Sequence, residues 1–169
     1  MDVGASTGGF TDCMLQHGAA AVIAVDTGYG QIAARLRADP RVKLLEKSNA
    51  RYLTAEQLRE ADGGAEITLI AIDVSFISVT LILPAVLKAA FAQPSSQPRE
   101  LIVLVKPQFE VGKKMVGKGG IVRDPQAQQD AVIKVKEAAA ALGGRNLKVI
   151  DSPILGMEGN REFLLHAEF

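Results

Sequence analysis

Residues 2–10 read Asp2-Val3-Gly4-Ala5-Ser6-Thr7-Gly8-Gly9-Phe10. Asp2 and Val3 end a short apolar strand, glycines and other small residues form a turn, and a helix is expected to begin near Phe10 or Thr11. Glycine allows a backbone to turn sharply and to approach a ligand closely. The pattern therefore predicts an α/β strand-to-helix turn that forms part of a ligand site.

The spacing of the glycines excludes two kinds of phosphate loop. A dinucleotide fingerprint requires G-x-G-x-x-G, but Ser6 stands where its second glycine should be. A P-loop requires lysine after its last glycine, and here Phe10 follows Gly9. Asp2 would repel a pyrophosphate but suits a positively charged ligand, such as the sulfonium of S-adenosylmethionine. We predict that this cofactor contacts Asp2, Gly4, Ala5, Ser6, Thr7, Gly8, Gly9 and Phe10.

Two polar residues farther along support an adenosine site. Asp26 follows the apolar run 20–25, about 20 residues beyond the glycine loop, where a carboxylate can accept both ribose hydroxyls of a nucleoside. Asn49 follows the third apolar segment, 42–46, and its amide is predicted to read the adenine edge. Taken alone, each of these residues is more typical of a helix cap or a turn; their order and spacing favour the nucleoside site.

Apolar runs alternate with segments of helical spacing along the rest of the chain. Strands are expected at 67–72, 101–105, 149–150 and 163–165, and helices at 54–59, 81–91 and 125–142. This alternation predicts an α/β fold with a mostly parallel sheet and helices on both faces. The carboxyl ends of the parallel strands should then bring Gly4, Asp26, Asp73 and Lys106 to one crevice.

Asp73 and Lys106 are charged residues at the ends of apolar strands, where burial is costly without a partner. A structural salt bridge is one interpretation, but the neighbouring cofactor loop favours a catalytic pair. Glu162, at the start of a late strand, is a candidate second carboxylate that holds Lys106. The alternative for Glu162 is an exposed hairpin residue.

Composition limits the broad class of the protein. The 169 residues carry equal acidic and basic counts, 19 each, and 48% are hydrophobic, which fits one globular domain. The single cysteine, Cys13, excludes an internal disulfide and fits a reducing cytosol. A helix needs about 20 apolar residues to span a bilayer, and no apolar run in the sequence is that long. We therefore expect a soluble cytoplasmic protein without membrane partners. No metal site is predicted.

A glycine-rich basic loop lies between residues 110 and 123. Its charged side chains could bind RNA phosphates, although an ordinary solvated loop is the alternative. The predicted RNA-binding residues are Lys113, Lys114, Lys118 and Arg123.

Six ordered motifs resemble the TlyA or hemolysin A family of FtsJ-like ribosomal RNA 2′-O-methyltransferases, and the resemblance covers essentially the whole chain. It implies a Rossmann-like S-adenosylmethionine-dependent methyltransferase fold with an antiparallel C-terminal strand, S-adenosylmethionine as cofactor, and ribosomal RNA or ribosomal subunits as partner. The target nucleotide, the subunit and the oligomeric state are not implied. The motifs are Asp2-Val3-Gly4-Ala5-Ser6-Thr7-Gly8-Gly9-Phe10-Thr11-Asp12, Val25-Asp26-Thr27-Gly28-Tyr29-Gly30-Gln31, Ile72-Asp73-Val74-Ser75-Phe76-Ile77-Ser78, Val105-Lys106-Pro107-Gln108-Phe109-Glu110, Gly117-Lys118-Gly119-Gly120-Ile121-Val122-Arg123-Asp124-Pro125 and Gly159-Asn160-Arg161-Glu162-Phe163-Leu164.

The resemblance also implies a lysine-aspartate-lysine-glutamate catalytic tetrad, of which Asp73, Lys106 and Glu162 are three members. The first lysine and a small RNA-binding module precede the glycine loop in the family. We therefore expect residues 1–169 to be an FtsJ-like methyltransferase domain, truncated at its N-terminus and impaired in activity. A noncatalytic nucleoside- or RNA-binding remnant is the alternative, and a membrane-lytic hemolysin is the least favoured.

Overall fold

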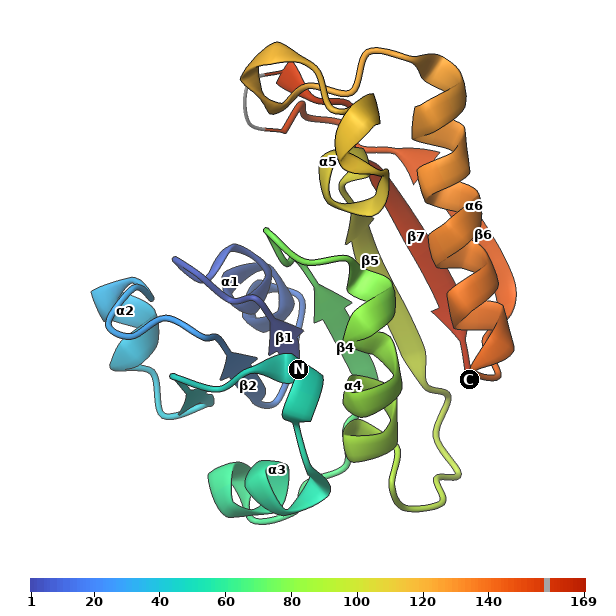
Figure 1. Cartoon of the computed structure of the whole chain (residues 1–169). Helices are drawn as coiled ribbons and strands as arrows, with labels where there is room; N and C mark the ends of the chain where they lie inside the picture. Colours follow the sequence, from blue (N-terminus) through green and yellow to red (C-terminus); the bar gives the residue numbers. More distant parts are fainter. Residues whose placement is uncertain (157–158) are drawn as a thin grey trace.

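The computed structural model describes residues 1–156 and 159–169. Seven strands form one sheet in the order β3-β2-β1-β4-β5-β7-β6 (Figure 1). The strands are β1 (Asp2–Val3), β2 (Val22–Val25), β3 (Val42–Leu45), β4 (Leu69–Ile72), β5 (Glu100–Val105), β6 (Arg145–Asp151) and β7 (Phe163–Glu168). The α-helices are α1 (Gly9–Gln16), α2 (Ala34–Arg37), α3 (Ala55–Asp62), α4 (Leu83–Ala90), α5 (Pro107–Glu110) and α6 (Pro125–Ala141). Short 3₁₀ turns are η1 (Ala50–Tyr52), η2 (Val79–Leu81), η3 (Lys113–Met115) and η4 (Lys118–Gly120).

The first five strands are parallel, and the last two are antiparallel additions. β1 pairs with both β2 and β4, so the strand order changes direction at β1. β7 runs antiparallel to β5, and β6 runs antiparallel to β7. Open α/β sheets bind ligands at such a switch point. The predicted Rossmann-like sheet with an antiparallel C-terminal part is confirmed.

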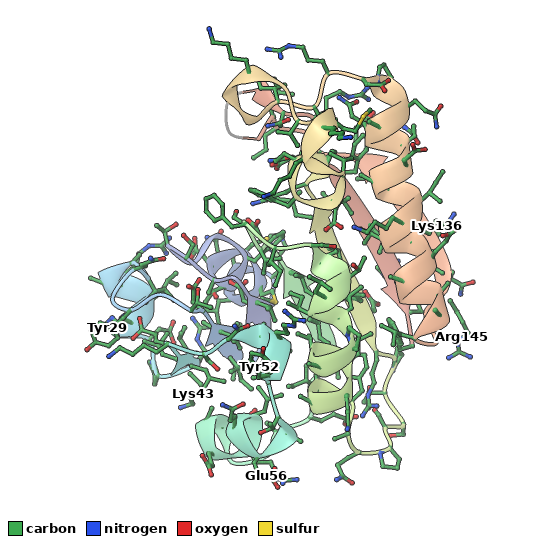
Figure 2. The ribbon with its side chains drawn as sticks, in the orientation of Figure 1. Tyr29, Lys43, Tyr52, Glu56, Lys136 and Arg145 are labelled. Atoms are coloured by element: carbon green, nitrogen blue, oxygen red, sulfur yellow. The ribbon has the colours of Figure 1, made fainter. Side chains whose placement is uncertain are left out.

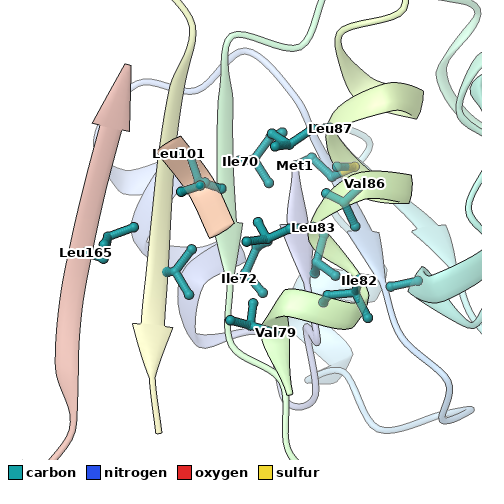
Figure 3. Close-up of a cluster of buried hydrophobic side chains, with 14 of the residues drawn as sticks. Met1, Ile70, Ile72, Val79, Ile82, Leu83, Val86, Leu87, Leu101 and Leu165 are labelled. Atoms are coloured by element: carbon teal, nitrogen blue, oxygen red, sulfur yellow. The ribbon is translucent and has the colours of Figure 1, made fainter. Parts of the chain in front are cut away.

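Helices cover both faces of the parallel half of the sheet. One core contains Ile70 and Ile72 of β4 together with side chains of α3, α4 and α6, and Figure 3 shows its centre. Ala71, between them in β4, belongs to a second core under α1 and α2. This alternation follows from the two-residue period of a strand, which points successive side chains to opposite faces.

The helix ends follow the capping signals in the sequence. Thr54 and Gln57 form a reciprocal capping box at α3, and the side chain of Asp124 caps α6 before Pro125. Gly143, at φ 100°, follows the end of α6. The four-residue helix α2 has no side-chain cap and was not predicted from the pattern.

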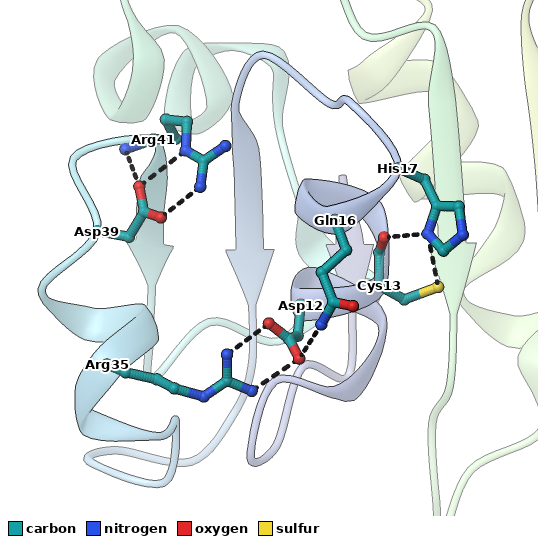
Figure 4. A network of polar contacts seen from close by, with 7 residues as sticks. All are labelled: Asp12, Cys13, Gln16, His17, Arg35, Asp39 and Arg41. Carbon is teal, nitrogen blue, oxygen red and sulfur yellow. Dashed lines mark hydrogen bonds and ion pairs between the residues drawn. The ribbon is translucent and has the colours of Figure 1, made fainter.

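Helix α2 is held beside α1 by one ion pair. Both Arg35 guanidinium nitrogens contact the Asp12 carboxylate, at 2.6 and 2.7 Å (Figure 4). The guanidinium of Arg35 lowers the pKa of Asp12. Leu36 of α2 lies in the same core as Met14 and Leu15 of α1, so apolar packing joins the two helices as well.

Candidate active site

A cavity of about 530 Å³ opens at the carboxyl ends of β1, β2 and β4. Its volume falls in the range of small-molecule sites, about 300–1,000 Å³. Its walls come from the loops after these strands and from the segment after β3. The lining residues are Val3, Gly4, Ser6, Val25, Asp26, Thr27, Gly28, Gln31, Ser48, Asn49, Ala50, Asp73, Val74, Ser75, Phe76, Ile77 and Ile82.

Gly4 allows the loops after β1 and β4 to meet at the cavity. Its φ is +86°, and an added Cβ would lie 2.1 Å from the carbonyl oxygen of Asp73. Both the backbone conformation and the contact exclude a side chain. The Gly4 amide donates to the carbonyl of Val25 at 2.8 Å, which ties the same turn to β2.

The structure divides the predicted cofactor residues into two groups. Those that line the cavity are Gly4, Ser6, Asp26, Asn49 and Asp73. Those outside its lining are Asp2, Ala5, Thr7, Gly8, Gly9 and Phe10. The glycine loop therefore presents only its first turn to the cavity, and its second half begins α1.

Asp2 lies beneath the start of α1 rather than in the cavity wall. Its Oδ2 accepts bonds from the amide and the hydroxyl of Thr11, at 2.9 and 2.6 Å. Burial raises the pKa of Asp2, although the bonds from Thr11 act in the opposite direction. The acidic residue that suggested a cation-binding loop thus stabilises the strand-to-helix turn itself.

Asp26 joins the two loops that face the cavity. Its Oδ2 accepts the amide of Ser6 at 2.8 Å, and its Oδ1 accepts the amide of Gly28 at 2.7 Å. Each carboxylate oxygen can accept more than one hydrogen bond, so this arrangement orients Asp26 without using all its acceptor capacity. Asn49 also lines the cavity, but its Oδ1 accepts the Arg51 amide at 3.0 Å and caps η1.

Glu46, which was not among the predicted site residues, also holds a loop of the cavity wall in place. Glu46 Oε1 accepts a hydrogen bond from the Gly30 amide at 2.8 Å. The same oxygen forms an ion pair with the Arg37 guanidinium at 2.6 Å. The ammonium of Lys47 lies 4.5 Å from the ring centroid of Tyr29, whose ring is at the surface (Figure 2). These contacts shape the loop that presents Gly28 and Gln31, and no short motif around Glu46 indicates them.

The predicted pair of Asp73 and Lys106, at the ends of β4 and β5, is present as an ion pair. Lys106 Nζ lies 2.5 Å from Asp73 Oδ1 and donates to Ser75 Oγ at 3.2 Å. The Lys106 side chain is 14% exposed and that of Asp73 is 35% exposed. The ion pair therefore borders both the cavity and solvent, where a substrate can reach it.

Glu162 lies beside this pair but does not complete it as predicted. Pairing of Val105 with Phe163 places Lys106 and Glu162 opposite each other, one residue beyond the ends of two adjacent strands. Among the described residues, the Lys106 ammonium forms its ion pair with Asp73 and a hydrogen bond with Ser75, and Glu162 instead accepts a 3.5 Å bond from Gln108. Burial raises the pKa of Glu162, although the charge of Lys106 opposes this.

A pair of aromatic rings stands next to the ion pair. Phe76 lines the cavity, is 89% exposed and has a φ of +66°, a conformation that is uncommon for a bulky residue. Its ring centroid lies 5.3 Å from that of Phe109. A large apolar ring held open to solvent beside a polar pair offers a flat surface to a planar substrate group.

The basic loop leaves the sheet beyond this site and is held at its two ends. Glu110 is buried at one end, and Val122 is 1% exposed at the other. Asn160 accepts the Val122 amide and donates to the Gly120 carbonyl, both at 3.0 Å. The predicted RNA-binding side chains are all exposed: Lys113, Lys114, Lys118 and Arg123.

Within residues 1–156 and 159–169, no cluster of three or more His, Cys, Asp or Glu side chains could hold a metal ion. Within the same residues, every helix is too short or too polar to cross a bilayer.

The chain is similar to known proteins over its whole length. The model of the family described as FtsJ-like methyltransferase matches residues 1–169. A Mycobacterium tuberculosis protein named 16S/23S rRNA (cytidine-2′-O)-methyltransferase TlyA is 47% identical over 165 residues, which is 98% of this chain. The chain spans 58% of the length of that relative.

Two solved structures show how far the similarity extends in space. A crystal structure from Lactococcus lactis is 42% identical with a TM-score of 0.88, covering 99% of this chain and 76% of that chain. The O-methyltransferase TomG from Streptomyces achromogenes, solved with its cofactor, is 15% identical with a TM-score of 0.57. It covers 98% of this chain and 70% of that chain, and at this identity it shows the fold alone.

Proposed function

The chain belongs to the FtsJ-like methyltransferase family, and we propose that it transfers a methyl group from S-adenosylmethionine to ribose 2′-hydroxyls of ribosomal RNA. The observation that carries this proposal is the Lys106–Asp73 pair at 2.5 Å, which borders a cavity of nucleoside size. A relative at 47% identity is named for this reaction on cytidine. We further propose that the protein acts in the cytoplasm on ribosomal RNA or ribosomal subunits.

The residues around the cavity fit an adenosyl sulfonium ligand. The turn at Gly4 leaves no room for a side chain, so a ligand can approach the backbone there. The carboxylate of Asp26 is held at the cavity wall, where it can accept ribose hydroxyls. Asp73 supplies negative charge near the place where a sulfonium would lie, and Asn49 offers an amide for the adenine edge.

The chain's own groups can orient and activate a hydroxyl. When bound, the cofactor supplies an electrophilic methyl group on a positively charged sulfur. The ammonium of Lys106 can donate to the hydroxyl oxygen and stabilise the negative charge that develops on it. When Lys106 Nζ passes one proton to Asp73, its freed lone pair can accept the hydroxyl proton, so Lys106 returns to its charged form and Asp73 ends protonated. Glu162 adds a second carboxyl group beside the same lysine.

The exposed basic side chains of residues 113–123 supply the RNA contacts in this proposal. Phosphate contacts from lysine and arginine position a nucleic acid without reading its bases. The loop starts directly after α5, which carries Phe109 and Glu110, so RNA bound to it would lie close to Lys106. Phe76 is placed to contact the base of the target nucleotide.

Two measurements test the proposal. Calorimetry with S-adenosylmethionine should show one site, and incubation with labelled cofactor and undermethylated ribosomal subunits should transfer label to a ribose 2′-oxygen. Lys106→Met should bind the cofactor but fail to transfer the label. Cofactor binding without turnover by the unaltered chain would favour the noncatalytic alternative, and absence of binding would refute the cavity assignment.

A further inference from the structure

Glu110 is a buried carboxylate that takes no part in the reaction described above. It is 7% exposed and does not line the cavity. Its Oε1 accepts the amide of Val79 at 2.7 Å, and its Oε2 accepts the hydroxyl of Ser78 at 2.5 Å. Lys134 of α6 places its ammonium 3.2 Å from Oε2 and donates to the Glu110 carbonyl at 2.8 Å. A buried charge with this many donors is held in one orientation.

These contacts connect the two segments that carry the catalytic pair. Ser78 lies five residues after Asp73, and Glu110 lies four residues after Lys106. Backbone pairing between β4 and β5 is recorded up to Ile72 and Val103, before either catalytic residue. Beyond this ladder the two segments are joined to each other by side-chain contacts, while backbone bonds to β1 and β7 hold each one to its other neighbour.

Three side chains after β5, those of Lys106, Phe109 and Glu110, contact the segment after β4 in sequence. The ion pair of Lys106 with Asp73 comes first, and the ring contact of Phe109 with Phe76 comes second. Glu110 makes the last contact, at the start of η2. Because Phe76 holds a φ of +66° between the first and last contacts, the segment 73–79 needs attachment at both ends to keep this shape.

We propose that Glu110 is a positioning residue that sets the alignment of Asp73 with Lys106, and that Lys134 is its counter-charge. The carboxylate acts on the reaction only through the segment 73–79, since it does not border the cavity. The proposal rests on the proposed methyl transfer for its effect on rate. Its effect on the ion pair itself does not depend on turnover.

The central variant is Glu110→Gln, which keeps the size of the side chain but removes its charge. The kcat for methyl transfer should fall about ten- to hundredfold, because small misplacements of catalytic groups have effects of this order. The Kd for S-adenosylmethionine should change less than kcat, because Glu110 does not line the cavity itself.

A second readout is independent of activity. In the wild-type chain the Lys106 ammonium is held by Asp73 and Ser75, so its protons should exchange slowly with water in lysine-detected NMR. Glu110→Gln should accelerate this exchange. Ser78→Ala removes one of the hydrogen bonds to Glu110 and should give a smaller acceleration of the Lys106 exchange. This variant also tests the proposal if Glu110→Gln does not fold.

Thr54→Ala is the matched control, because it removes a comparable cap from α3, away from the cavity. It should lower the midpoint of thermal unfolding without changing kcat or the Lys106 exchange rate. If Glu110→Gln behaves like Thr54→Ala, Glu110 is only structural and the proposal is overturned. If wild-type turnover is absent but Lys106 exchange still accelerates in Glu110→Gln, the methyl-transfer proposal fails and the positioning of the pair stands.

Discussion

The proposed cofactor side and the proposed RNA side of the site are organised by polar side chains whose partners lie at different distances along the sequence. On the cofactor side, Asp26 binds amides 20 and 2 residues away, and Glu46 binds one 16 residues away. On the RNA side, Glu110 binds residues 31 and 32 positions away, and Asn160 binds residues 38 and 40 positions away. The first wall therefore depends on neighbouring βα units, whereas the second requires the C-terminal strands to have joined the sheet.

The difference has a functional consequence. The hydrogen bonds of Asp26 and Glu46 can hold their part of the cavity wall in the absence of a ligand. The basic loop is exposed over most of its length and attached at its ends, so under the proposed function it can adapt to RNA while Glu110 and Asn160 keep those ends near the Lys106–Asp73 pair. The Lys106–Asp73 pair lies where the two sides meet.

The largest expected effect comes from removing Lys106 from the Lys106–Asp73 pair, where the two sides meet. Lys106→Met should lower kcat about a thousandfold or more, as loss of a member of a catalytic unit does. Cofactor affinity should remain within a few-fold, because Lys106 does not line the cavity. Single-turnover kinetics and calorimetry on the same preparation measure both quantities; a parallel loss of binding would place Lys106 on the cofactor side.

The next effect concerns the cofactor wall itself. Gly4→Ala introduces a Cβ 2.1 Å from the Asp73 carbonyl at a φ of +86° and should reduce the free energy of unfolding by about 2–4 kcal/mol. It should also weaken cofactor binding, because the loops after β1 and β4 must separate. Urea unfolding and calorimetry measure these losses.

Gly9→Ala is the comparison for this change. An added Cβ there meets nothing within 4 Å, and Gly9 begins α1, so stability should stay the same or rise slightly. Equal losses of stability and cofactor affinity in both variants would show that the close approach of Gly4 to Asp73 does not explain the effect of Gly4→Ala.

A smaller effect is expected on the RNA side. Replacing Lys113, Lys114 and Lys118 with glutamine should weaken RNA binding about ten- to hundredfold at low salt and reduce the slope of log K against log salt by about 2–3. The fold should be unchanged, since these side chains are exposed. A triple replacement of Lys43, Lys88 and Lys136 with glutamine is the charge-matched control, and an equal effect on its slope would contradict a specific role for the loop.

The smallest effect is on stability and depends on pH. Burial raises the pKa of Glu162, so its ionised form is disfavoured in the folded state. The stability that it contributes is present below the unfolded pKa and is lost as the pH rises through the folded pKa. Glu162→Gln should therefore gain about 1 kcal/mol over the wild type at neutral pH, but not in acid, while losing activity. Urea titrations at several pH values measure this difference, and a gain that is the same at all pH values would contradict its assignment to ionisation.

Several features were predictable because neighbouring residues determine them. Thr54 and Asp124 are helix caps whose partners lie within three residues, and both caps form as expected. The apolar runs ending at Asp73 and Lys106 indicated parallel strands whose ends meet, and the two side chains do meet. The late strands were located, although β6 extends from Arg145 to Asp151 rather than over two residues.

Other features depend on partners that the local sequence pattern does not indicate. Asp2, which stays a predicted cofactor residue, has its carboxylate under α1, where it accepts the hydroxyl of Thr11. Glu162 was predicted to hold Lys106, but Asp73 and Ser75 already contact that ammonium. Helix α2 has little pattern of its own and depends on contacts such as that of Arg35 with Asp12.

The sequence by itself determined the strand-to-helix turn, the alternation of strands and helices, and the charged residues at the strand ends, since each rests on backbone preference or on local periodicity. Only the tertiary structure decided which side chains face the cavity, which partner holds Lys106, and how Glu110 and Asn160 anchor the basic loop. A carboxylate binds whichever donors the packed chain brings within about 3 Å, and for these residues the donors come from segments far apart in the sequence.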